Sequence, residues 1–189
     1  MPTLSWPRAM RGIFVALSAW WGGSALAATD ETQGWTTAQV QVRATKTTIV
    51  TMDFSQRFRE RRSGDEQQLV RVGLDHMVAP GVQVGGGIAY LEASNEKEHR
   101  LFQQVIFTKG IWLARTRIEE RFYDNGDDPL LRLRQRLQAS VPVDSAKRWT
   151  VVMAGEAMWH LTRARASDKK GFATWRAQVG LRHAINKHL

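Results

Sequence analysis

Few side chains in this sequence have the types and spacing that a catalytic or metal site requires. Glu156 and His160 fall on one face of a predicted strand, but residues four apart in a strand are separated by about 13 Å, too far for an acid–base pair. Ser55 and Ser140 share the polar side with His160, which leaves open a hydrolase that takes its serine and histidine from different strands. No H-x-H or H-E-x-x-H spacing occurs among the five histidines, His76, His99, His160, His183 and His188. We therefore predict no catalytic residue, no metal site and no cofactor.

Two further absences narrow the chemistry. The 189 residues include no cysteine, which excludes a thiol nucleophile, a disulfide scaffold and every cysteine-based zinc site. The acidic run 124–128 lacks the spacing of an EF-hand and predicts an exposed turn.

Arginine is the residue that stands out, because it recurs at alternate positions. Arg115, Arg117 and Arg121 alternate with apolar residues in 112–122, and the same pattern fills 131–141. These positions share one face of each predicted strand with a few carboxylates, and we predict that they line the lumen of a barrel. The candidates are Asp53, Arg57, Arg59, Arg71, Asp75, Arg115, Arg117, Glu119, Arg121, Arg132, Arg134, Arg136, Glu156, His160, Arg176 and Arg182. Such arginines either pair with the acids and fill the interior or attract anions, which guanidinium groups bind bidentately.

The elements that must position these residues are strands. Segments of period-2 alternation are separated by turn residues, and we predict an all-β, antiparallel up-and-down barrel in a single domain, residues 28–189. About nine strands are expected, near 35–44, 48–61, 68–78, 82–93, 98–108, 111–123, 130–141, 148–162 and 172–186. A helix remains an alternative for 98–108 and 130–141, where apolar residues also recur at helical spacing.

Residues 1–27 have the pattern of a secretory signal peptide. Arg8 and Arg11 precede the apolar stretch 13–21, and Ala25-Leu26-Ala27 is an A-x-A cleavage site. The stretch is shorter than the roughly 20 residues of a membrane-spanning helix. Removing these two arginines from the 27 basic residues leaves 25 against 18 acidic residues in the mature chain.

Aromatic spacing favours a membrane barrel over a soluble one. Trp149 and Trp159 lie ten residues apart on one apolar face, as do Trp112 and Phe122. Ten residues cover about 33 Å along a strand, which a tilt of about 40° reduces to about 25 Å, the height of a lipid-facing belt. We predict that these four side chains lie at the membrane interfaces. Gln135, in the middle of an apolar face, counts against the prediction.

Several short motifs resemble those of a bacterial family, domain-of-unknown-function family 2490. They are Arg-Ile-Glu-Glu-Arg-Phe-Tyr (117–123), Arg-Leu-Arg-Gln-Arg-Leu (132–137), Glu156 within Ala-Gly-Glu-Ala-Met-Trp, and Arg-Ala-Gln-Val-Gly-Leu (176–181). The resemblance covers about residues 35–189 and implies a predicted outer-membrane β-barrel of a Gram-negative bacterium, with 10–12 strands in the complete family. Family members extend further at the C-terminus, so the expectation is a truncated barrel here.

These observations favour an outer-membrane β-barrel of unknown specific activity, structural or pore-like and not an enzyme. The alternatives are a soluble periplasmic barrel that binds an apolar ligand and an outer-membrane lipid-modifying enzyme. Expected partners are outer-membrane lipid, the outer-membrane assembly machinery and small anions. The formal charge of +9 would also suit nucleic acid, but an exported chain is not expected to meet it.

Overall fold

The computed structural model describes residues 13–16, 33–59, 66–93 and 96–184. Nine long strands, each of 11 to 14 residues, and one short strand of four residues account for most of them. Their bounds are β1 (Ile13–Ala16), β2 (Gln33–Arg43), β3 (Thr48–Arg59), β4 (Gln67–Ala79), β5 (Val82–Ala93), β6 (Glu96–Lys109), β7 (Trp112–Tyr123), β8 (Leu130–Pro142), β9 (Trp149–His160) and β10 (Gly171–His183).

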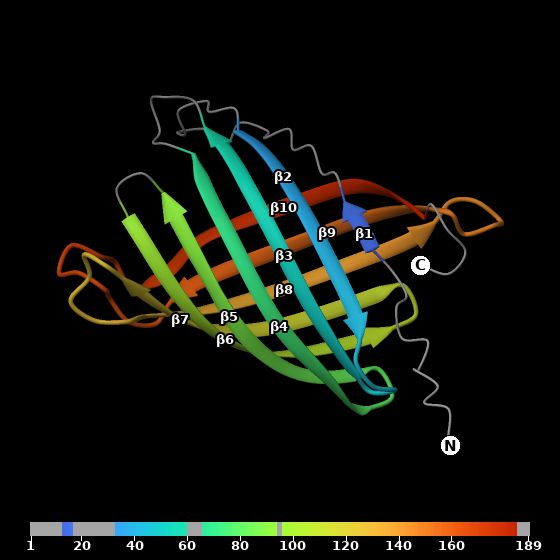
Figure 1. Cartoon of the computed structure of the whole chain (residues 1–189), viewed down its shortest axis with the longest axis horizontal. Coiled ribbons are helices and arrows are strands. Elements are labelled where there is room, and N and C mark those ends of the chain that lie inside the picture. The colour runs from blue at the N-terminus through green and yellow to red at the C-terminus, as the bar shows by residue number, and fades with distance from the viewer. Residues whose placement is uncertain (1–12, 17–32, 60–65, 94–95, 185–189) are drawn as a thin grey trace, which may run out of the picture.

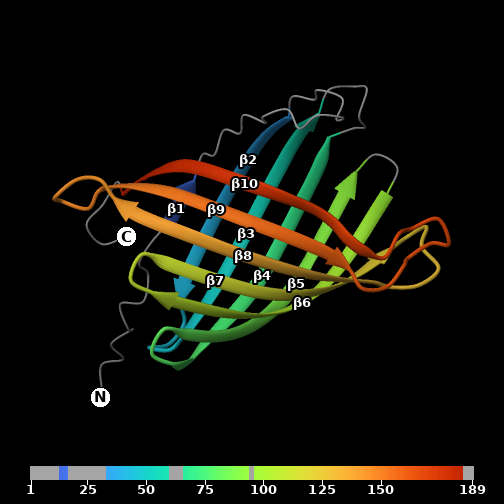
Figure 2. The same ribbon diagram turned by 180° about the vertical axis from the view of Figure 1, so that it is seen from behind.

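The strands form one antiparallel sheet in chain order, each hydrogen-bonded to the next. The sheet curls into a half-barrel, so that β8–β10 cross on the opposite side from β2–β5 (Figures 1 and 2). Among the described residues, β10 pairs only with β9, which leaves the sheet open along this edge. The prediction of nine antiparallel up-and-down strands is confirmed.

The helical alternative for 98–108 and 130–141 is wrong. Both segments lie in strands, β6 and β8, which pair with β7 on either side. The alternation of β6 is obscured because Phe102 lies on the polar side of its strand, where it is 6% exposed. Its neighbour Leu101 points the other way and is 49% exposed.

Strand β1 lies within the predicted signal peptide. It pairs with the middle of β2, from Thr37 to Val40. The rest of the predicted signal peptide, residues 1–12 and 17–27, is outside the described residues, and its removal stays a prediction. Cleavage after Ala27 would take β1 away and leave β2 as the second open edge.

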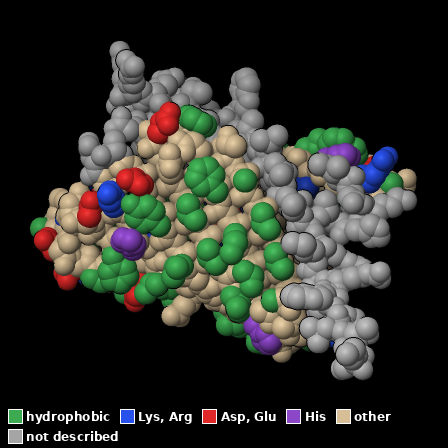
Figure 3. Space-filling view, viewed as in Figure 1, with side chains coloured by type: hydrophobic (Ala, Val, Ile, Leu, Met, Phe, Trp, Pro, Cys, Tyr) green, Lys and Arg blue, Asp and Glu red, His purple; other side chains and the backbone are tan. Residues whose placement is uncertain are grey.

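Polar and apolar side chains are distributed on this sheet in the opposite way to a soluble protein. The concave face carries the buried charges, among them Asp53, Glu98 and Arg117. The convex face carries large hydrophobic side chains that are about half exposed, such as Met52 (54%) and Ile88 (59%). Figure 3 shows hydrophobic side chains spread over this outer face, with acidic groups near one rim.

In an antiparallel sheet, successive connections lie at alternating ends. The loops at 124–129 and 161–170 lie at one end. Tight turns at 80–81 and 110–111 lie at the other end, where Gly81 and Gly110 adopt positive φ. In the turn before β9, the Trp149 N–H donates to Asp144 Oδ1 at 2.7 Å, and this bond lowers the pKa of the Asp144 carboxyl.

Candidate functional site

The centre of the concave face is Glu156 on β9, a carboxylate that is 3% exposed. It accepts hydrogen bonds from three arginines on three other strands. The donors are Arg115 Nη2 at 2.9 Å from β7, Arg134 Nη2 at 2.8 Å from β8 and Arg176 Nε at 2.8 Å from β10. Arg176 lies directly opposite Glu156 in the register of β9 and β10. Arg134 reaches it diagonally from β8, and Arg115 reaches it from β7 across β8.

Arg134 joins Glu156 to a second buried carboxylate, Glu119. Its Nη1 donates to Glu119 Oε1 at 2.7 Å, while its Nη2 holds Glu156. Glu119 also accepts from Arg132 Nε at 2.8 Å, and Arg117 Nη1 stands 3.6 Å away. One guanidinium therefore bridges two acids, which the fixed fork of arginine suits better than lysine.

A third carboxylate, Glu98 on β6, is 1% exposed and pairs with two arginines. Arg100 Nη2 donates to Glu98 Oε2 at 2.7 Å, and Arg121 Nη2 donates to the same oxygen at 2.8 Å. The Arg121 guanidinium also stands over the Tyr123 ring, 5.0 Å from its centroid.

Toward β4 the network continues through an amide. Gln104 Nε2 donates to Asp75 Oδ1 at 2.6 Å, and Gln104 Oε1 accepts from Arg117 Nε at 3.0 Å. The Arg117 guanidinium lies 4.3 Å from the centroid of the Phe102 ring. Arg117 is 4% exposed, so this cation–π contact is shielded from water and stronger than a surface pair.

Glycines make room for the inward Phe102. Gly87 on β5 faces Gly73 on β4, and the Phe102 ring lies over both. A Cβ on Gly87 would stand 2.8 Å from Phe102 Cζ and 2.1 Å from the Val72 carbonyl oxygen, which is closer than real Cβ atoms come. The run Gly85-Gly86-Gly87 therefore permits close approach between strands rather than forming a phosphate loop.

The remaining sequence-predicted residues lie around this network. Arg71 Nε on β4 donates to Asp53 Oδ2 on β3 at 2.8 Å, whereas the three glutamates lie on β6, β7 and β9. Three residues, Arg57, Arg136 and His160, are partly buried, whereas Arg182 on the edge strand is exposed. The side chain of Arg59 is outside the part of the structure that is described.

Sequence reasoning missed Glu98, Arg100 and Gln104. The three alternate along β6, which is the signal that could have identified them, but Phe102 occupies the position between Arg100 and Gln104 on the same face. An apolar residue in the middle of a polar face made the segment look helical.

The arrangement is one of paired fixed charges. Each of the three glutamates is held by two or more guanidinium groups, so none is free to act as a general base. Within the described residues, no group of three or more His, Asp or Glu side chains is placed to hold a metal ion. Among the described residues, three buried side-chain atoms have no hydrogen-bond partner: Asp53 Oδ1, Arg115 Nε and Gln178 Oε1.

The four predicted interfacial aromatics lie on the convex face at its two ends. Trp112 (52% exposed) and Trp149 (39%) stand at the end of the sheet that has the turns at 80–81 and 110–111. The ring centroids of Trp149 and His183 are 4.1 Å apart. Phe122 (40% exposed) and the partly buried Trp159 stand near the longer loops.

The polar Gln135, which argued against a lipid-facing surface, has a partner. The Thr116 hydroxyl donates to Gln135 Oε1 at 2.6 Å across β7 and β8. The pair satisfies part of the hydrogen-bonding capacity of both side chains and lowers the cost of placing them on an apolar face.

The described residues contain no helix that is long and apolar enough to cross a membrane.

Comparison with curated proteins found no match. A family model described as "Protein of unknown function (DUF2490)" matches residues 32–189, which covers the nine long strands. The chain therefore belongs to the DUF2490 family, as its arginine-rich motifs indicated.

Proposed function

We propose that the mature chain is an outer-membrane β-barrel protein of a Gram-negative bacterium, with a structural or pore-like role. The observation that carries this proposal is the inverted sheet: charges are buried on the concave face, and large hydrophobic side chains are exposed on the convex face. Water would penalise such a surface, because each large apolar side chain gains about 1.5–3 kcal/mol when it leaves water. A lipid bilayer removes that penalty.

The ends of the convex face support the same location. Trp112 and Trp149 mark one end, and Phe122 and Trp159 mark the other. Aromatic rings prefer the boundary between hydrocarbon and head groups, and lipid-facing belts of barrels are flanked by two such girdles. The predicted signal peptide supplies the route across the inner membrane.

The concave face sets the character of the interior. Its arginines outnumber its carboxylates, which are Asp53, Asp75, Glu98, Glu119 and Glu156. In a completed barrel these charges hold the strands together, and the excess of guanidinium groups favours anions over cations near the wall. A soluble barrel that binds an apolar ligand inside would need an apolar concave face, so the observed polarity favours the membrane barrel.

Fractionation of cells that express the full chain tests the proposal. We expect the protein in the outer-membrane fraction, resistant to extraction by carbonate and urea, with an N-terminus at Ala28. Recovery from the periplasm without detergent would refute the membrane location. Acyl release from labelled phospholipid by the purified protein would replace the structural role with the lipid-modifying one.

Reversal potentials in planar bilayers test the pore version separately. We expect a preference for chloride over potassium. Arg136→Gln should reduce it, because it removes a partly buried guanidinium that donates to the neutral Gln138. A preference for cations in the unmodified protein would leave the arginines as interior packing alone.

A further inference from the structure

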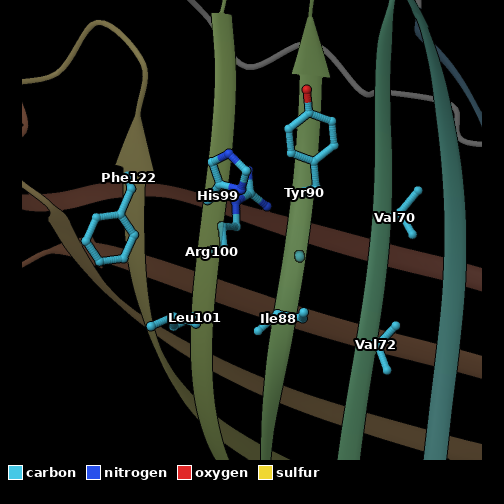
Figure 4. Close-up of a pocket in the computed structure, with 9 residues that line it drawn as sticks. Val70, Val72, Ile88, Tyr90, His99, Arg100, Leu101 and Phe122 are labelled. Carbon is cyan, nitrogen blue, oxygen red and sulfur yellow. The ribbon is translucent and has the colours of Figure 1, made fainter.

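The convex face is hollowed across β4–β7 near the end with the longer loops. The hollow measures about 420 Å³, and its walls are mainly apolar side chains and the rings of Tyr90 and His99. The centroids of these two rings are 5.1 Å apart. Figure 4 shows the labelled residues, with Ile88 and Leu101 at one end and Tyr90 and His99 at the other. The other lining residues are Val70, Val72, Ile88, Ala89, Leu101, Phe122 and Arg100, whose guanidinium is paired with Glu98.

A second hollow, of about 460 Å³, continues the first toward the rim and is polar. Each of the four strands contributes the next residue on the same face, about 7 Å farther along. Gln68 follows Val70, Glu92 follows Tyr90, Lys97 follows His99, and Asp124 follows Phe122. The two hollows together are amphipathic, apolar toward the middle of the sheet and charged at its rim.

The charges of the polar hollow are mainly negative. The carboxylates are Glu66, Glu92, Glu96 and Asp124, and the cation in the lining is Lys97. Lys97 Nζ stands 3.9 Å from Glu92, and Arg165 pairs with Glu96 from the neighbouring loop. The hollow therefore complements a ligand head that carries a cationic group, with one cation of its own to receive a phosphate.

We propose that the two hollows form a binding site for a zwitterionic glycerophospholipid with a primary-amine head group. One acyl chain lies in the apolar hollow, the phosphate faces Lys97 and His99, and the ammonium group faces Glu92 and Asp124. The site rests on the proposed function in that the bilayer brings lipid to this face. An anionic lipid is disfavoured because the carboxylates outnumber the cations.

Lipid retention by the purified full-length protein tests the site. The protein in detergent is mixed with phosphatidylethanolamine or phosphatidylglycerol of identical acyl chains, and bound lipid is counted by native mass spectrometry. We expect roughly tenfold tighter retention of phosphatidylethanolamine, the effect of one charge-assisted contact. Equal retention of the two lipids by the unmodified protein would overturn the proposal, and this comparison needs no variant.

Two variants assign the effect to the two hollows. Ile88→Trp fills the apolar hollow and should abolish the preference. Ile118→Trp, at a position that is also about half exposed but lies outside the hollow, should not. Glu92→Gln combined with Asp124→Asn should equalise the two lipids. If Ile88→Trp keeps the same preference for phosphatidylethanolamine as Ile118→Trp, lipid does not bind in the apolar hollow and the proposed site is wrong. Because retention is measured in detergent, its failure would leave the location of the protein, which fractionation decides, unaffected.

Discussion

The buried carboxylate Glu156 offers the sharpest test of the arginine network. Glu156→Gln keeps the shape of the side chain but removes the negative charge that faces Arg115, Arg134 and Arg176. Arg134 keeps its bond to Glu119, but the cluster of three guanidinium groups loses the buried carboxylate that they share. Removing one partner of a buried ion pair costs about 3–5 kcal/mol, and we expect a loss of stability in that range. This is a large part of the roughly 5–15 kcal/mol that holds a typical protein folded.

Unfolding by urea in detergent micelles, followed through tryptophan fluorescence, measures this loss. Asp128→Asn is the matched control, since it removes an exposed carboxylate in a loop without changing its shape. We expect the control to change the free energy of unfolding by at most about 0.5 kcal/mol. An unchanged dependence of that free energy on urea concentration would show that both proteins unfold from the same state.

A double-mutant cycle separates the ion pairs from a general effect of the substitution. Arg115→Gln added to Glu156→Gln removes one of the cations that the first substitution leaves without this carboxylate, so the double variant should lose less stability than the two single variants combined. The expected coupling is about 0.5–3 kcal/mol. A loss below about 1 kcal/mol in Glu156→Gln, or strictly additive effects, would refute the view that buried ion pairs hold the concave face together.

Three further predictions concern the strands and their connections. Gly87→Ala should lower the free energy of unfolding by about 1–3 kcal/mol, and Gly155→Ala, where a new Cβ meets nothing within 4 Å, should not; urea unfolding compares them. Because the pKa of Asp144 is lowered in the folded protein, its contribution to the turn is present above its ordinary pKa and is lost as the pH falls through the lowered value. The protection of the Trp149 amide against hydrogen exchange, relative to its intrinsic exchange rate at each pH, should fall over this range. In Asp144→Asn this protection should no longer change with pH. On intact cells an impermeant maleimide should label either Asp128→Cys or Ala146→Cys but not both, because the antiparallel sheet places them at opposite ends; labelling of both would contradict the topology.

Much of the fold follows from local sequence pattern. Strand β7, predicted at 111–123, lies at 112–123, because Arg115, Arg117, Glu119 and Arg121 occupy alternate positions and a helix would distribute their charges around its axis. Turn residues placed the remaining boundaries within a few positions. The alternation also assigned Glu119 and Glu156 to the polar face, since a period of two leaves only two faces to choose between.

Other features depended on the tertiary structure. Alternation does not tell which face is concave, because a soluble barrel and an inverted one have the same period; the direction in which the sheet curls decided it. The pairing of Arg134 with both Glu119 and Glu156 depends on the register across three strands, which the geometry of two loops and the burial of one face set together. The inward position of Phe102 depends on Gly87 and Gly73 in strands that are remote in sequence. Each of these features is a long-range contact, and for that reason only the folded sheet reveals it.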